Sequence, residues 1–269
     1  MRQILIILVF ASVACAQNTH PISTNVLDQV KLPGEFSSTS GDLSSYEKGN
    51  VVADSYIEQK AVIWTSWNES LTVTPYVSAD FVLDTYGYNW NNKWSPSVGI
   101  KVNKHIPRGV VTAGIGYMYE NRFRNADGFK PAGGRTDFLT GWFGWQDVTE
   151  PNKRFPGATW AIIGHYSPAE AGNLMERAHG QQGYVLTRFG KTALVPFGEV
   201  TIAHDSKRFD WENIATVGAG MKYGFPVGKT YTEFGADYLW ETRLLSNRTA
   251  RGLKVFVDVS HSWNLLGRK

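Results

Sequence analysis

The chain has 269 residues, of which 13% are aromatic, and a formal net charge of +3 at pH 7. So small a charge, with no basic run, gives no indication of nucleic acid as a partner. Mean hydropathy is −0.26, and no later segment offers the roughly 18 consecutive apolar residues that predict a transmembrane helix. These values exclude a helical membrane protein but leave a β-barrel open, because half of each barrel strand faces water.

The amino terminus has the anatomy of a secretory signal peptide. Arg2 precedes an apolar run, and Ala14-Cys15-Ala16 forms an A-x-A site, which predicts a signal peptide over residues 1–16. Cleavage there removes Cys15, the single cysteine of the chain, and excludes a disulfide framework, a thiol nucleophile and a cysteine metal site. The alternative is a lipoprotein signal that retains Cys15 as a lipidated residue, although Ser12 stands where such signals usually have leucine.

The next segment, residues 17–49, is rich in Ser, Thr, Gly and Pro. We predict a flexible N-terminal extension there, because such a segment buries little apolar surface. From residue 50 onward, strand-like patterns recur, so residues 50–269 are predicted to form one domain.

The pattern is clearest over Leu71–Leu83 and Val110–Arg122, where apolar and polar residues alternate. Alternation of period two gives a strand one apolar and one polar face. Ordinary strands have about 5–6 residues, whereas transmembrane barrels require long alternating strands. We therefore predict an all-β fold, an antiparallel up-and-down transmembrane β-barrel in the bacterial outer membrane, in contact with its lipid. A soluble β-sandwich is the alternative, disfavoured by strand length.

About twelve strands are expected, an even number as in single-chain bacterial barrels. In chain order they are residues 51–58, 60–67, 71–84, 97–105, 110–124, 135–147, 157–166, 184–188, 193–204, 214–223, 230–242 and 252–263. Residues 167–182 are expected to form a helix or a loop over the barrel mouth. The last strand departs from the usual terminal aromatic residue of barrels, because six residues follow Trp263.

Charged residues and one histidine on the predicted inner face are candidates for the lumen or a ligand track. They are Asp80, Asp84, Lys101, Glu120, Arg122, His165, Glu199, Lys222, Glu233, Asp237 and Glu241, with Lys254 and Asp258. A salt-bridged network that fills a narrow barrel is one interpretation, and a channel wall is the other. In a channel, the carboxylates Glu233, Asp237 and Glu241 would favour cations.

A second candidate site is the loop that contains Tyr86, Tyr88, Trp90 and Trp94 among several asparagines. Aromatic faces beside amide groups suit carbohydrate. An interfacial aromatic girdle explains the same residues equally well.

Catalysis is not predicted. His165, His204-Asp205-Ser206 and His261 supply the residue types of a hydrolase, but no G-x-S-x-G motif occurs. Adjacent residues of a strand diverge and cannot form a triad with each other. We expect no cofactor, and no metal, since H-E-x-x-H is absent.

One stretch of the last third resembles a known group of barrels. It comprises Pro196–Val200, Asp205–Trp211 and Val217–Met221, and it is similar to the C-terminal barrels of exopolysaccharide-export porins and phage-adsorption outer-membrane proteins. The resemblance implies a channel or surface-binding barrel for polysaccharide or oligosaccharide, working with a separate periplasmic helical-repeat partner. The alternative is a non-conducting structural or phage-receptor barrel, and a third is an outer-membrane barrel hydrolase.

Overall fold

A computed structural model describes residues 31–42, 46–123, 128–146 and 154–265. The predicted signal peptide and Cys15 lie outside these residues. The strands are β1 (Pro33–Asp42), β2 (Val51–Lys60), β3 (Trp64–Thr65), β4 (Leu71–Asp84), β5 (Lys93–Ile106), β6 (Gly109–Arg122), β7 (Ala132–Gln146), β8 (Gly157–His165), β9 (Met175–Gly183), β10 (Thr187–Phe189), β11 (Thr192–Asp205), β12 (Ile214–Val227), β13 (Thr230–Arg243) and β14 (Thr249–Asn264). Two 3-10 turns, η2 (Asn89–Asn91) and η3 (Pro168–Glu170), lie in loops.

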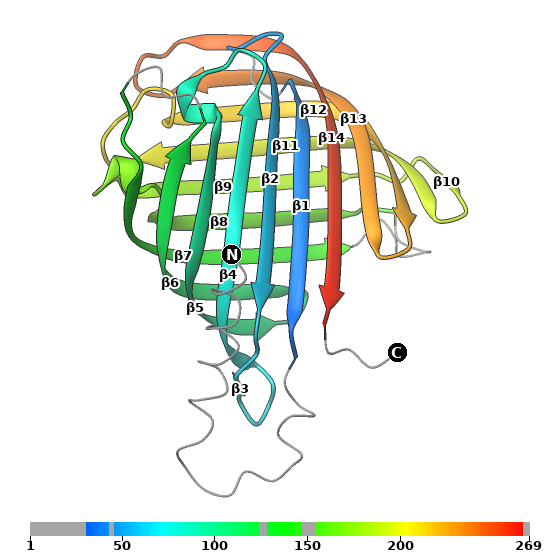
Figure 1. The fold of residues 1–269 in the computed structure, drawn as a ribbon. Helices are drawn as coiled ribbons and strands as arrows, with labels where there is room; N and C mark the ends of the chain where they lie inside the picture. The colour runs from blue at the N-terminus through cyan, green and yellow to red at the C-terminus, as the bar shows by residue number, and fades with distance from the viewer. Residues whose placement is uncertain (1–30, 43–45, 124–127, 147–153, 266–269) are drawn as a thin grey trace, which may run out of the picture.

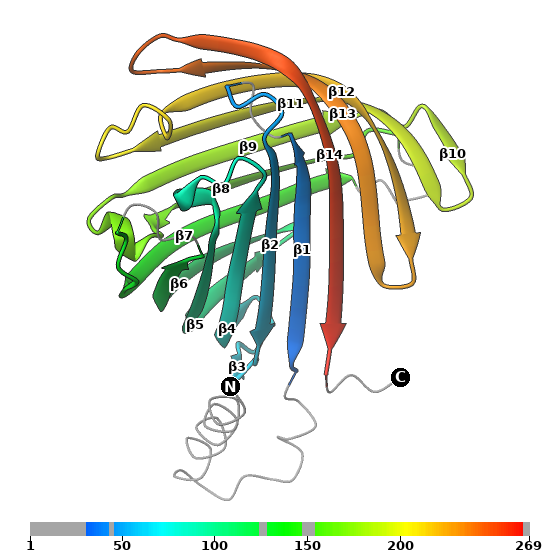
Figure 2. The ribbon, with the colours of Figure 1, turned by 45° about the horizontal axis from the view of Figure 1, so that its top comes forward.

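Twelve of these strands close into an antiparallel barrel. The order around the ring is β11-β12-β13-β14-β1-β2-β4-β5-β6-β7-β8-β9, and β9 pairs with β11 to complete it. The short strands β3 and β10 extend hairpins beside the ring and pair only with β4 and β11 among the described residues. Figures 1 and 2 show β1 between β14 and β2, so that the first and last strands meet in one wall.

The two faces of each long strand differ as the alternation predicts. On β5, Val98, Ile100 and Val102 point outward and are 41–45% exposed, whereas Thr74 and Tyr76 on the inner face of the neighbouring β4 are nearly buried. An exposed apolar band around a closed sheet is stable only against lipid, which the 14-residue strands are long enough to span. Among the described residues, no helix has the length and apolarity needed to cross a bilayer.

The predicted number of strands is confirmed, but two members of the set differ. Residues 60–67 and 184–188 give only the short pairings of β3 and β10, and the ring instead takes β1 and β9. The prediction of an extension over 17–49 is therefore wrong for residues 33–42, which form β1. Serine, threonine and glycine supply most of β1, so its side chains gave no hydrophobic alternation to detect.

β9 was missed for a related reason. Its residues were expected to form a helix or a mouth loop, because Pro168 to Arg177 contains several helix formers. In the structure only η3 is helical in this segment, and β9 pairs with β8 and β11 along its length. Pairing with two neighbours outweighs a weak local helix propensity.

Candidate functional site in the barrel lumen

A large cavity lies inside the barrel along β4, β5, β6 and β7. Its volume is about 1350 Å³. Hydroxyl, amide and aromatic side chains dominate its wall: Tyr56, Thr72, Thr74, Tyr76, Ser78, Ser97, Asn103, Thr112, Thr136, Phe138, Thr140 and Trp142. Most of this lining is neutral, so it offers hydrogen bonds and flat apolar faces rather than a strong field.

A buried carboxylate, Glu58 on β2, holds the charged part of this wall together. Its side chain is fully buried and makes an ion pair with Lys101 of β5 and a second, at 3.0 Å, with Lys60. The Tyr56 hydroxyl also donates a hydrogen bond to it. The ammonium of Lys101 lies 4.2 Å from the centre of the Tyr76 ring. A buried charge is tolerated only when paired in this way.

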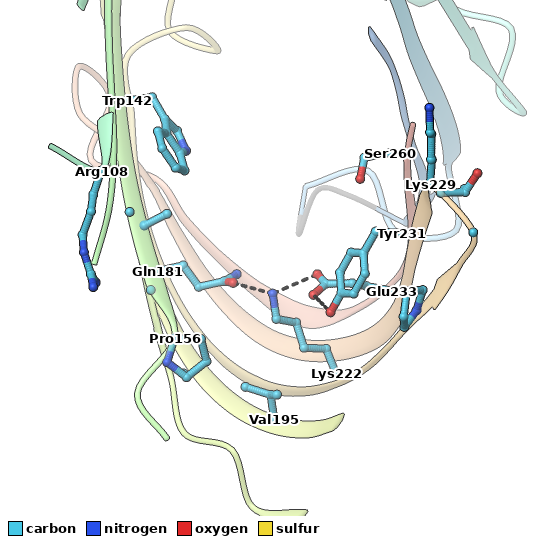
Figure 3. A pocket seen from close by; sticks show the side chains of 17 residues that line it. Arg108, Trp142, Pro156, Gln181, Val195, Lys222, Lys229, Tyr231, Glu233 and Ser260 are labelled. Carbon is cyan, nitrogen blue, oxygen red and sulfur yellow. Dashed lines mark hydrogen bonds and ion pairs between the residues drawn. The ribbon is translucent and has the colours of Figure 1, made fainter. Parts of the chain in front are cut away.

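A second cavity of about 630 Å³ shares Trp142 with the first and extends to β12 and β13 (Figure 3). Lys222 of β12 points into it and donates hydrogen bonds to Gln181 Oε1 at 2.7 Å and to Glu233 Oε2 at 2.8 Å. Tyr231 also donates to Glu233, at 3.1 Å. This wall is therefore occupied by mutually paired polar groups.

The same network continues toward β14. Gln181 donates to Glu199 of β11 at 3.2 Å, and Lys254 of β14 lies 3.1 Å from Glu199 and 3.5 Å from Asp237. Asp237 is 1% exposed. A continuous chain of ion pairs and hydrogen bonds therefore links β13, β12, β9, β11 and β14 across the lumen.

The structure thus brings together seven of the predicted lumen residues. Asp80 and Lys101 line the larger cavity, Lys222 and Glu233 line the smaller one, and Glu199 and Asp237 join the network through Lys254.

Three other predicted residues lie at the loop end of the barrel. Glu120 is buried and accepts hydrogen bonds from Arg122 at 3.1 Å and from Ser167 of the β8–β9 loop at 2.7 Å. Glu241 of β13 is likewise buried. Glu120 therefore joins the β8–β9 loop to the end of β6.

Three predicted positions differ from expectation. His165 has the opposite parity to Ile162 and Tyr166, which line the cavity, so it lies on the outer face of β8. The apolar residues Trp160 and Ile162 of β8 face the lumen, so His165, which was expected on the inner face, lies on the outer one. Trp94 pairs with outward-facing Phe81 and belongs to the lipid-facing side of β5, away from the loop aromatics.

The third is Asp84, which fixes the β4–β5 loop rather than lining the lumen. Asn92 Nδ2 donates to its Oδ1 at 2.7 Å, and the backbone amides of Gly87 and Tyr88 donate to the same oxygen at 2.6 and 3.0 Å. Within this loop Tyr88 stacks on Trp90 at 4.8 Å, and Tyr86 meets Tyr88 edge-on at 5.7 Å. Three of the four predicted loop aromatics therefore form one group.

Several lumen residues were missed in the sequence. Tyr56, Glu58 and Lys60 are spaced two residues apart on β2, and this spacing could have placed all three on the inner face. His179 and Gln181 alternate in the same way on β9, where a helix or loop was expected. His179 donates to or accepts from Thr201 Oγ1 at 2.9 Å, and its ring lies 5.7 Å from that of Trp160.

One residue that lines the larger cavity, Tyr166, has a shifted pKa. Burial raises the pKa of the Tyr166 hydroxyl, which lies in the loop after β8 and lines the larger cavity. Among the residues that the structure describes, no group of three or more His, Cys, Asp or Glu side chains is arranged to hold a metal ion.

A closed ring of long strands with an apolar outside and a polar, ion-paired inside fits one environment. The protein is an outer-membrane β-barrel. No protein family matches its sequence, and no curated protein does.

Solved structures similar to the barrel include an autotransporter domain, a porin and an outer membrane protein. The β domain of the Bordetella autotransporter BrkA is 14% identical with a TM-score of 0.39, over 87% of this chain and 99% of that chain. The KdgM porin is 10% identical with a TM-score of 0.39, over 86% and 99%. A loop-deletion mutant of OmpT, an outer membrane protein of Vibrio cholerae, is 9% identical with a TM-score of 0.36, over 87% and 99%. At these TM-scores the fold assignment depends on the strand pairing itself.

Proposed function

We propose that the barrel is a channel that takes up oligosaccharide along the wall formed by β4, β5, β6 and β7. The single observation that carries this proposal is the cavity of about 1350 Å³. Small-molecule pockets of about 300–1,000 Å³ already enclose a drug-sized ligand, so this space is large enough for more than one sugar ring.

The chemistry of the lining supports this ligand class. Phe138 and Trp142 contribute aromatic rings to the lining, and serine, threonine and asparagine side chains contribute hydrogen-bonding groups. Pyranose rings combine apolar C–H faces with a hydroxyl rim, so they match such a wall. Many weak contacts also suit passage, because a solute must bind well enough to enter and weakly enough to leave.

Two experiments on the refolded protein test the proposal. We expect steady single-channel currents in a planar bilayer that cellohexaose reduces, and swelling of proteoliposomes in small sugars. Ser78→Trp, which fills the cavity, should lower both signals. Val77→Trp is the matched control, because its side chain lies on the opposite face of the same strand. Silence from protein that still shows a heat-modifiable folded band would contradict the proposal.

The non-conducting barrel is the second candidate, and the network of Glu233, Lys222, Gln181 and Glu199 favours it. Such paired groups are expected where side chains fill a small barrel. A silent bilayer would select this alternative, and a surface receptor role would then be examined at the loops. A periplasmic helical-repeat partner stays a proposal, testable by co-purification from the native membrane.

A hydrolase role stays disfavoured by the local geometry. Asp205 accepts hydrogen bonds from its own loop, and the Ser206 hydroxyl donates to Asn173 at 3.3 Å and accepts from the Leu174 amide at 2.9 Å. These groups fix loops and are not aligned as a nucleophile with its base.

A further inference from the structure

The ring contains two copies of one six-stranded unit. Strands β4, β5 and β6 correspond to β11, β12 and β13 at a constant offset of 121 residues, with 14 residues in every one of these strands. We call β1, β2, β4, β5, β6 and β7 the first copy, and β8, β9, β11, β12, β13 and β14 the second copy. β4 and β11 have five strands between them in either direction around the ring, so they lie on opposite walls.

Strand registers agree between the copies. Lys101 pairs with Gly114 in the first copy, and its equivalent Lys222 pairs with Gly235 in the second. The segments 71–122 and 192–243 have identical residues at these equivalent positions: Pro75/Pro196, Asp84/Asp205, Trp90/Trp211, Asn92/Asn213, Gly99/Gly220, Lys101/Lys222, Gly114/Gly235, Tyr117/Tyr238, Glu120/Glu241 and Arg122/Arg243. The two sequences are otherwise too different for the repeat to have been noticed without the pairing.

The hydrogen bonds by which Asp84 and Asn92 fix the β4–β5 loop recur in the second copy, in the β11–β12 loop. In the second copy, Asn213 Nδ2 donates to Asp205 Oδ1 and to the Phe209 carbonyl, as Asn92 donates to Asp84 and to the Tyr88 carbonyl. Phe209 stacks on Trp211 at 4.9 Å, against 4.8 Å for the first pair. The residue three positions after each aspartate has a left-handed backbone in both loops.

At the opposite end of the barrel, a hydrogen bond between a tryptophan and a glutamine also occurs in both copies. Trp145 Nε1 donates to Gln182 Oε1 at 2.8 Å, and Trp263 Nε1 donates to Gln59 Oε1 at 2.9 Å. The second bond ties the last strand to the first copy, since β14 and β2 flank β1. Trp263 therefore helps to join the last strand to the first copy, although it is not the terminal residue of the chain.

The copies differ most inside the lumen. At four equivalent positions the first copy has a small neutral residue and the second copy has a larger charged one: Ser78/Glu199, Thr112/Glu233, Gly116/Asp237 and Thr136/Lys254. The larger cavity lies almost wholly within the first copy, and the charged set belongs to the network of the second. Local backbone geometry is shared, so the side chains account for the difference in free space.

We propose that Glu199, Glu233, Asp237 and Lys254 form a constriction that confines passage to the first-copy wall and sets the size limit for solutes. This inference rests on the proposed channel function. The pairs Lys254–Glu199 at 3.1 Å and Lys254–Asp237 at 3.5 Å hold the long side chains in place. A rigid, paired cluster obstructs a lumen more than mobile single charges do, because its members have little freedom to swing aside.

The repeat supplies the variant that tests the constriction. In E199S/E233T/D237G/K254T, each residue takes the identity found at the equivalent first-copy position. We expect single-channel conductance to rise about twofold, since both walls would then be open, and larger oligosaccharides to enter proteoliposomes. V200A/V257L is the matched control, because it makes the same kind of exchange at two lipid-facing positions and should leave conductance unchanged.

The reciprocal variant S78E/T136K installs the Lys254–Glu199 pair in the first copy, and it should reduce conductance. It serves as the second readout if the fourfold variant fails to fold. A conducting wild type with neither variant altered overturns the constriction and leaves the channel function standing. A silent wild type with a conducting fourfold variant upholds the constriction and overturns the channel function of the native barrel. Silence from both proteins overturns both.

Discussion

Replacing Lys101 by methionine should destabilise the barrel strongly through Glu58. The Glu58 side chain is fully buried, and Lys101, 14% exposed, is one of its two ion-pair partners. Loss of one partner of a buried pair costs about 3–5 kcal/mol, because the other charge is left without compensation. Lys60 remains at 3.0 Å from Glu58, so we expect a loss near the lower end, about 3 kcal/mol.

The second copy shows how the loss can be relieved. Gln181, which is neutral, stands at the position of Glu58 and accepts a hydrogen bond from Lys222. E58Q/K101M should therefore lose only about 1 kcal/mol, the value of an ordinary hydrogen bond. The double variant should therefore be about 2 kcal/mol more stable than Lys101→Met alone.

Urea unfolding of the protein in lipid vesicles, followed by tryptophan fluorescence and extrapolated linearly, measures these free energies. Val102→Met is the control, because residue 102 is adjacent to Lys101 in sequence but faces lipid. A loss for Lys101→Met no larger than that of the control would refute the reasoning. It would mean that the Glu58 carboxylate is hydrated or protonated in the folded barrel.

Two further substitutions use the repeat in other ways. Gly157→Ala should cost about 1–3 kcal/mol in the same urea assay, because a Cβ there would lie 2.2 Å from the Trp145 ring; an unchanged midpoint would show that the ring moves freely. Glu212→Asn should stabilise by about 1 kcal/mol, because Asp205 Oδ2 is buried with no hydrogen-bond partner among the described residues and the equivalent first-copy residue is an asparagine that donates. Burial and the charge of Glu170 raise the pKa of Glu212, so the folded wild type binds this proton more tightly and should lose stability as pH rises through the ordinary titration range of a glutamate and above it. That part of the pH dependence should vanish in Glu212→Asn, and its persistence would contradict the assignment.

The outward and inward faces of the long strands could be predicted from sequence. β4, β5 and β6 carry regular alternation over 14 residues, and this alone sets which residues meet lipid. β1 has small polar residues on both faces, and its place in the ring depends on pairing with β14 and β2. Such long-range pairing leaves no local trace in the chain.

The candidate site was predictable only in part. Lys101, Lys222 and Glu233 followed from parity. Their partners Glu58 and Gln181 lie on strands two places away around the ring, and no sequence pattern showed the register of those strands. The prediction for His165 was wrong because it assumed that apolar residues face lipid, whereas on β8 Ile162 lines the cavity. The network therefore became visible only once strand order was known.

Cysteine accessibility along β4 tests the central claim, a lipid-embedded barrel with an open first-copy wall. A chain without residues 1–16 has no cysteine, because Cys15 is the single one. Single cysteines are placed in turn over residues 72–79 and exposed to a membrane-impermeant thiol reagent in vesicles. The account predicts reaction at even positions, slowed by oligosaccharide, and none at odd positions, which face lipid. Equal reaction at both parities would contradict the membrane barrel, and no reaction at even positions would contradict the open wall.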